Sequence, residues 1–372
     1  MGKRELVLIA GFVFLGIVVY WFTAAPANDD DGGLSLRRIA RNIRAEVSGT
    51  RASRPVTASA RTSWSPGMTA VELEDFRGTL VVKGQTHGEL GAELSGEAFG
   101  LDETEATAAA KDIRVALEPH EDAIRLVLHV PPQMLGGRRP DLTLTVDMPA
   151  GMHLRLSDVE GNLDVRQIAS VTFDDVSAQI HIVDVAGQVS GKIERNSVDI
   201  SRVGVVDLVT SRGELIVSDV NGSVDVRQDR GSISLSRVKG PVTIDADRTD
   251  IEIDGTLAPL VVEARRGKLT VHRAEAPVTI DAENLGVRVT LARAVPLNVT
   301  TSDGRLDITL PPHDGVLVDA TVSDGELLVP DALRVDVSDD TQHARGPIGG
   351  GGAPLVVTNR NGTIIIRQIP QG

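Results

Sequence analysis

Between Gly204 and Ala276 the hydrophobic positions repeat every 18 residues. Each period holds two short aliphatic pairs, nine residues apart, and polar residues alternate with the aliphatic ones. Alternation with a period of two predicts β-strands with one buried face, and self-similarity at a fixed length predicts a solenoid. The aliphatic columns are Val224, Val242, Leu260 and Val278; Val226, Ile244, Val262 and Ile280; Ile233, Ile251, Leu269 and Val287; and Leu235, Ile253, Val271 and Val289.

Small residues and prolines mark the predicted corners of each coil. Glycine favours corners that need a positive φ, alanine fits where space is tight, and proline suits the first residue of a strand. These columns hold Gly213, Gly231 and Gly267; Gly222 and Gly240; Pro241, Pro259 and Pro277; and Ala246, Ala264 and Ala282.

The same phase continues with small slips in both directions, so residues 151–369 are predicted to form the solenoid, with about 18 residues and two short strands per coil. Residues 68–150 are β-rich but out of phase, with one short helix near Glu103, and are predicted to be an N-terminal cap. The predicted fold class is therefore all-β: a single-stranded β-helix with an N-terminal β-rich cap, preceded by one transmembrane helix.

The transmembrane prediction rests on residues 6–25, which are twenty in a row without a charge. This is about the length that crosses a bilayer. Residues 1–5 would form a short tail before this signal anchor, and Lys3 and Arg4 favour a cytoplasmic N-terminus with the body outside. A cleavable signal peptide is the alternative, because Ala25-Pro26-Ala27 resembles a processing site.

Residues 26–67 are predicted to be a juxtamembrane linker, and within it residues 34–47 have the pattern of a basic amphipathic helix. Such a helix can lie on anionic lipid, and an ordinary soluble linker helix is the alternative. The predicted contacts with the lipid surface are Arg37, Arg38, Arg41 and Arg44.

The amino-acid composition argues against several classes of function. Cysteine is absent and the net charge is −14, with a net charge of +4 on residues 1–61 and −18 on the remainder, so the acidic body is not expected to bind nucleic acid. The eight histidines show no metal-binding spacing, and no catalytic motif is present, so no cofactor, metal or catalytic residue is predicted. Few aromatic residues remain outside the apolar segment to serve as sugar platforms.

One column needs an explanation beyond folding. Arg212, Arg230, Arg248 and Arg266 follow each other at the 18-residue period, and stacking about 5 Å apart would make neighbours repel. One interpretation is a solvated edge partly neutralised by Asp229 and Asp247. The other is a linear edge that binds an anionic envelope polymer or an acidic strip on a protein partner.

Several segments together resemble the putative adhesin domain family DUF4097, a family of unknown function in bacterial envelope proteins. They are residues 71–82 (VELEDFRGTLVV), the helix near Glu103, residues 146–149 (VDMP), the repeated glycine-led strands and residues 361–364 (NGTI). The resemblance covers roughly residues 68–369. It implies a β-helix and brings no catalytic residues.

The predicted function is a non-enzymatic, membrane-anchored envelope scaffold or adhesion and interaction module. The predicted location is the bacterial cell membrane, with one pass and the body outside the cytoplasm, and the bilayer and an envelope polymer or protein are the expected partners. Two alternatives stay open: a polysaccharide-active β-helix enzyme, and a self-polymerising scaffold of the bactofilin type. The oligomeric state is not predicted.

Overall fold

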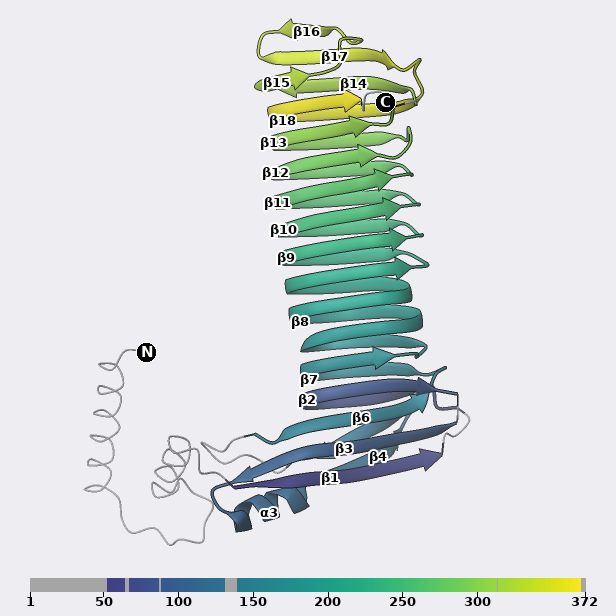
Figure 1. Cartoon of the computed structure of the whole chain (residues 1–372), viewed down its shortest axis with the longest axis vertical. Helices are drawn as coiled ribbons and strands as arrows, with labels where there is room; N and C mark the ends of the chain where they lie inside the picture. Colours follow the sequence, from purple (N-terminus) through teal and green to yellow (C-terminus); the bar gives the residue numbers. More distant parts are fainter. Residues whose placement is uncertain (1–51, 64–66, 87, 131–138, 313, 369–372) are drawn as a thin grey trace, which may run out of the picture. The chain divides into compact units, whose positions relative to one another are not determined.

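The computed structural model describes residues 52–63, 67–86, 88–130, 139–312 and 314–368. Most of them lie in strands (Figure 1). The strands are β1 (Ala52–Ser63), β2 (Ala70–Gln85), β3 (Glu89–Gly100), β4 (Arg114–His120), β5 (Ala123–His129), β6 (Asp141–Pro149), β7 (His153–Arg166), β8 (Ser170–Val220), β9 (Val224–Val238), β10 (Val242–Thr256), β11 (Leu260–Ala274), β12 (Val278–Leu291), β13 (Leu297–Leu310), β14 (Val316–Ser323), β15 (Gly325–Leu328), β16 (Val335–Ser338), β17 (Thr341–Ile348) and β18 (Ala353–Gln368).

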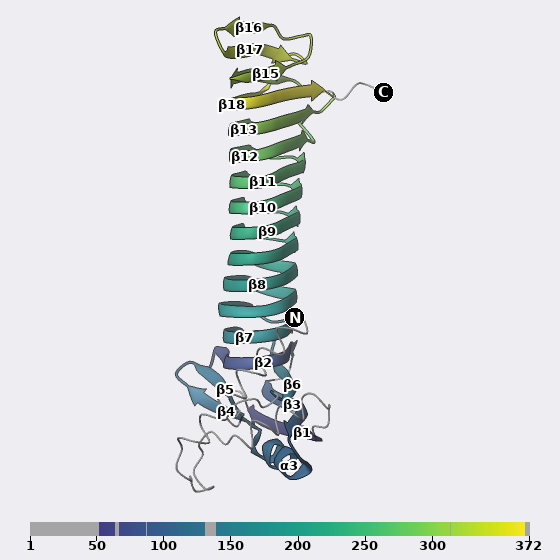
Figure 2. The same ribbon diagram turned by 90° about the vertical axis from the view of Figure 1, so that its left-hand side faces the viewer.

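The central strands stack as parallel coils, one above the next (Figures 1 and 2). Val242 of β10 pairs with Val224 of β9 on one side and with Leu260 of β11 on the other. The predicted 18-residue register is confirmed for these coils. Each central coil is one continuous strand of 14 or 15 residues that turns a corner within it, where the sequence predicted two separate short strands.

The aliphatic columns fill the interior of the stack. Ile233 and Val226 are fully buried, and so are their counterparts in the neighbouring coils. Each such side chain contributes roughly 1.5–3 kcal/mol of transfer free energy before the entropy of ordering is subtracted. The regular interior therefore fixes which side chains face outward on every coil.

Both ends of the stack depart from sequence order. β2 pairs in parallel with β7, Gly78 opposite Gly161, and on its other side with β5 and β6. At the far end β18 lies between β13 and the strands β14 and β15. The hairpin of β16 and β17 then pairs antiparallel with β14. Each end is thus completed by a strand that is distant in the sequence.

The described residues divide into two compact units. The larger holds residues 57–63, 67–86, 88–95, 114–128, 142–312 and 314–368, and the smaller holds residues 52–56, 96–113, 129–130 and 139–141. The smaller unit contains α3 (Glu103–Asp112), whose N-cap Asp102 accepts a hydrogen bond from the Glu105 amide at 2.9 Å. The Glu105 carboxylate in turn accepts one from the Leu101 amide at 2.8 Å, which fixes the start of the helix.

The predicted fold class is corrected on one point. Among the described residues no helix is both long and apolar enough to cross a bilayer. The ten residues of α3 span about 15 Å, half the hydrocarbon core, and they include Glu103, Glu105 and Lys111. The segment predicted to span, residues 6–25, and the predicted amphipathic helix, residues 34–47, lie outside the described residues.

Candidate functional site

The predicted arginine column lies at one corner of the coils, which we call the glycine corner. At this corner Gly161, Gly213 and Gly231 have φ values of 124–126°. A Cβ added to Gly231 would lie 1.9 Å from the carbonyl oxygen of Gly213 in the coil before it. Glycine is thus needed here for both its conformation and its size.

The glycine corner places five arginines in successive coils. Arg212 is the register partner of Arg230, and Arg248 and Arg266 turn the corner with left-handed φ values of 47° and 57°. Arg195, 17 residues before Arg212, joins them, because the Ser211 hydroxyl donates to the backbone carbonyl of Glu194 across the two coils. We call these five exposed residues the arginine row: Arg195, Arg212, Arg230, Arg248 and Arg266.

A buried amide stiffens the backbone beneath the arginine row. Gln228 is only 4% exposed, and its side-chain nitrogen donates to the carbonyls of Gly213 and Arg230, each at 3.1 Å. Its side-chain oxygen accepts a hydrogen bond from the Thr210 hydroxyl at 2.9 Å. Two adjacent coils are therefore tied together directly under Arg230.

Two aspartates neutralise the later part of the arginine row. Arg248 lies 3.1 Å from Asp229 and 2.9 Å from Asp247, and Arg266 lies 2.6 Å from Asp247. Partial burial opposes ionisation of Asp247, but the hydrogen bond from Arg266 and the charge of Arg248 hold its pKa below the usual range. Arg230 faces Asp229 at 3.5 Å.

The first two members of the arginine row differ from the rest. Within the described ranges neither Arg195 nor Arg212 forms an ion pair with a carboxylate. Sequence reasoning found Arg212 but missed Arg195, because the coil between them is one residue short of the 18-residue period. A search that allowed 17-residue steps would have included it.

Earlier coils make the same corner acidic. Asp75, Asp158 and Asp175 turn it with φ values of 51–52°, and with Arg195 they line a shallow groove of about 550 Å³. Cations partly compensate these carboxylates, since Lys192 contacts Asp175, and Arg77 and Arg195 also line the groove.

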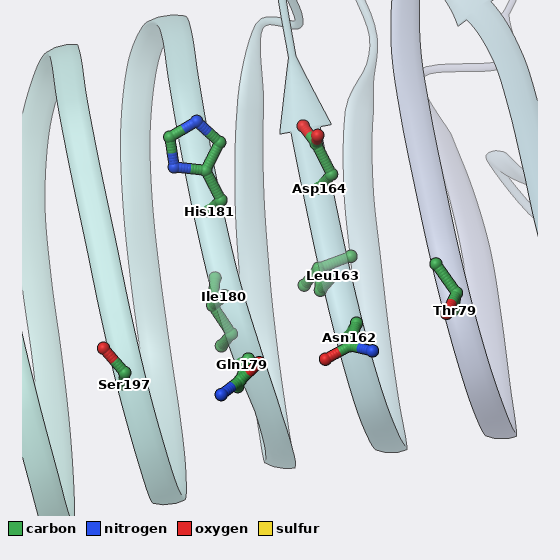
Figure 3. Close-up of a pocket in the computed structure, with 8 residues that line it drawn as sticks. All are labelled: Thr79, Asn162, Leu163, Asp164, Gln179, Ile180, His181 and Ser197. Atoms are coloured by element: carbon green, nitrogen blue, oxygen red, sulfur yellow. The ribbon is translucent and has the colours of Figure 1, made fainter.

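A second groove, of about 440 Å³, lies on the flat face that follows the glycine corner (Figure 3). Its lining comes from β2, β7 and β8. We call it the amide groove, because Asn162 and Gln179 project from it side by side and pair in register. The residues that line it are Thr79, Asn162, Leu163, Asp164, Gln179, Ile180, His181 and Ser197.

The charged groups along the amide groove are already partnered. Arg166 donates two hydrogen bonds of 2.7 Å to the carboxylate of Asp164, and these bonds hold the pKa of Asp164 below its usual range. His181 lies 3.4 Å from Asp199 through Nδ1. The groove therefore presents mainly neutral hydrogen-bonding groups to solvent.

Two further sequence predictions concern lipid contacts and metals. Arg37, Arg38, Arg41 and Arg44 lie outside the described residues. In the part of the chain that the structure describes, no cluster of three or more histidine, aspartate or glutamate side chains is arranged to hold a metal ion.

Comparisons with known proteins give structural neighbours at low sequence identity. A putative adhesin from Parabacteroides distasonis matches with a TM-score of 0.39 and 12% identity, over 68% of this chain and 96% of that one. A putative adhesin from Parabacteroides merdae matches with a TM-score of 0.32 and 10% identity over the same shares. A putative cell adhesion protein from Clostridium sporogenes matches with a TM-score of 0.20 and 10% identity, over 85% of this chain and 100% of that one.

No family model matches the chain, and no curated protein matches it. The resemblance to DUF4097 is therefore not supported by a family match. All three neighbours are named as adhesins or cell adhesion proteins, as the resemblance to an adhesin family led us to expect. Their TM-scores lie below 0.5, so they assign no function to this chain.

Proposed function

We propose that this chain is a non-enzymatic interaction module, whose solenoid displays the arginine row to an extended anionic partner. The observation that carries the proposal is the alignment of five exposed arginines in successive coils, two of them without a carboxylate partner among the described residues. A guanidinium presents several donors in a plane that matches carboxylate and phosphate groups.

The chemistry of the row favours a linear partner. Successive coils repeat at about the strand spacing of 4.8 Å, so a polymer with closely spaced anions can meet one guanidinium after another. The net charge of the chain is −14, which repels anions at long range. Because the screening length is about 8 Å at physiological ionic strength, the local charges of the row dominate at contact.

Arg195 and Arg212 would supply most of the attraction. The other three arginines share Asp229 and Asp247, and a new anion would have to compete with those carboxylates. The double variant R195Q/R212Q removes both unpaired charges and keeps polar, though shorter, side chains. Its β-type circular dichroism should match that of the parent chain.

The test measures binding of the full chain to polyphosphate and to alginate, a polycarboxylate, by fluorescence anisotropy at two salt concentrations. We expect R195Q/R212Q to weaken binding at least tenfold, which corresponds to about 1.4 kcal/mol. The control is R227Q/R288Q, which alters two exposed arginines on the flat faces of the coils. Equal affinities for all three proteins would overturn the proposal.

The location of the solenoid outside the cytoplasm is a separate part of the proposal. Proteolysis of intact cells, compared with lysed cells, tests it. Digestion of the solenoid only after lysis would contradict a cell-surface location. For a cell with an outer membrane, digestion after selective outer-membrane permeabilisation would support the periplasm.

A further inference from the structure

The amide groove contains a row of neutral side chains that runs across successive coils. Thr79 of β2 pairs in register with Asn162 of β7, and Asn162 pairs with Gln179 of β8. Ser197 continues the row on the next coil and lines the same groove. Further along the solenoid the equivalent positions carry charges in three of four coils: Glu214, Ser232, Asp250 and Lys268.

The four side chains of this neutral row are available for binding. Asn162 and Gln179 are exposed, and Thr79 and Ser197 are half-buried. Among the described residues none of the four side chains forms a hydrogen bond. Each amide offers two donors and an acceptor oxygen, and each hydroxyl can donate and accept. The row therefore presents both kinds of group at intervals of about 4.8 Å.

The surroundings of the row select against charged ligands. Besides the neutral row, the groove is lined by Asp164 and His181. Asp164 is held by Arg166, and His181 faces Asp199, so these two residues offer no uncompensated cation to attract an anion. The arginine row belongs to the corner, whereas the amide groove lies on the flat face that follows it.

The backbone under the groove is not free to bind a peptide strand. β2 pairs with β6 on one side and with β7 on the other, and β7 pairs with β8. Strand addition needs an open sheet edge, which these coils do not present to the groove. A ligand must therefore be recognised by the outward side chains alone.

We propose that the amide groove is a binding site for a neutral, hydroxyl-rich glycan chain that lies along the solenoid axis across β2, β7 and β8. Sugar hydroxyls both donate and accept, as the amides and hydroxyls of the row do. The groove is shallow and its groups are solvated, so a short oligosaccharide binds weakly, and a longer chain gains affinity by spanning more coils.

Saturation-transfer NMR on the full chain tests this with three uncharged linear probes: cellohexaose, chitohexaose and maltohexaose. We expect at least one of them to bind, and its affinity to fall at least fivefold in N162A/Q179A. The control N298A/Q188A removes two other exposed amides from the solenoid and should bind like the parent chain. Circular dichroism confirms that each variant is folded.

A second pair of variants separates this site from the arginine row. N162D/Q179E keeps the side-chain size, adds two charges and should lower oligosaccharide affinity like the alanine variant. R195Q/R212Q should leave it unchanged. The proposal is overturned if none of the three probes binds, if N162A/Q179A binds like the parent, or if only the arginine variant loses binding.

Discussion

At the scale of single residues, the interior of the solenoid depends on columns of identical geometry. Ile233 is the register partner of Leu215 in one neighbouring coil and of Ile251 in the other, and all three are at most 2% exposed. A side chain here has aliphatic register partners above and below. The column consequently tolerates changes in aliphatic shape better than any change in polarity.

Ile233→Asp should lower the free energy of unfolding by at least about 3 kcal/mol, because it places a carboxyl group in this column without a partner. Urea unfolding followed by circular dichroism measures the effect. Thr279→Asp is the matched control: it is exposed, its register partners are Val261 and Asn298, and it should change stability by less than about 0.5 kcal/mol. A loss below 1 kcal/mol for Ile233→Asp would contradict the assigned strand face.

At the scale of the coil, the corner opposite the glycine corner is built from charged residues in left-handed conformation. Asp184, Arg202, Asp219 and Arg237 have φ values of 53–60°. Arg202 donates to Asp184 at 2.5 and 3.2 Å, and Arg237 donates to Asp219 at 2.6 and 2.7 Å. The same residues that adopt the unfavourable left-handed conformation at the corner thus also link adjacent coils through their side chains.

These ion pairs predict a dependence of stability on pH. The hydrogen bonds from Arg202 and Arg237 lower the pKa values of Asp184 and Asp219 below the reference value of 3.8. A carboxyl with a lowered folded pKa stabilises the fold above its unfolded pKa, and this contribution is lost as the pH falls through the folded pKa. The effect is small, because the two aspartate side chains are 41% and 39% exposed and solvent screens the ion pairs.

The double variant D184N/D219N tests this contribution. Its unfolding free energy should lie below that of the parent by a constant amount between pH 5 and pH 7, and the difference should shrink below about pH 4. Urea titrations at several pH values measure the difference. A gap that widens towards acid pH would reverse the sign of the argument.

At the scale of the coil, some features could be predicted from the sequence and others could not. The central coils were predictable because their 18-residue spacing places Val224, Val242 and Leu260 in one column. Arg195 was missed because one coil is shorter by a residue. The insertions of β2 and β18 were missed because parallel pairing between distant segments leaves no local turn signal in the sequence. The amide groove was missed because neutral polar residues carry no spacing motif.

At the scale of the larger unit, the order of strands in space makes the C-terminal strand a connecting element. Gly362 of β18 pairs with Gly304 of β13 and also with Gly325 of β15. Without β18, the edges of β13 and of β14 would be exposed, and unpaired strand edges invite association. The short hairpin of β16 and β17 covers β14 on its far side.

Because β18 pairs with strands on both sides, a cavity within it should loosen both neighbours together. Ile364→Ala removes a fully buried side chain that pairs with Leu306 and Leu327, and should cost about 2–5 kcal/mol. Amide hydrogen exchange should then show faster exchange in β13 and β15 than in the central coils, β9 to β11. Val356→Ala is the control in the same strand, since Val356 is 44% exposed and its truncation leaves no cavity. Faster exchange in β18 alone, with β13 and β15 unchanged, would show that the inserted strand does not connect its neighbours energetically.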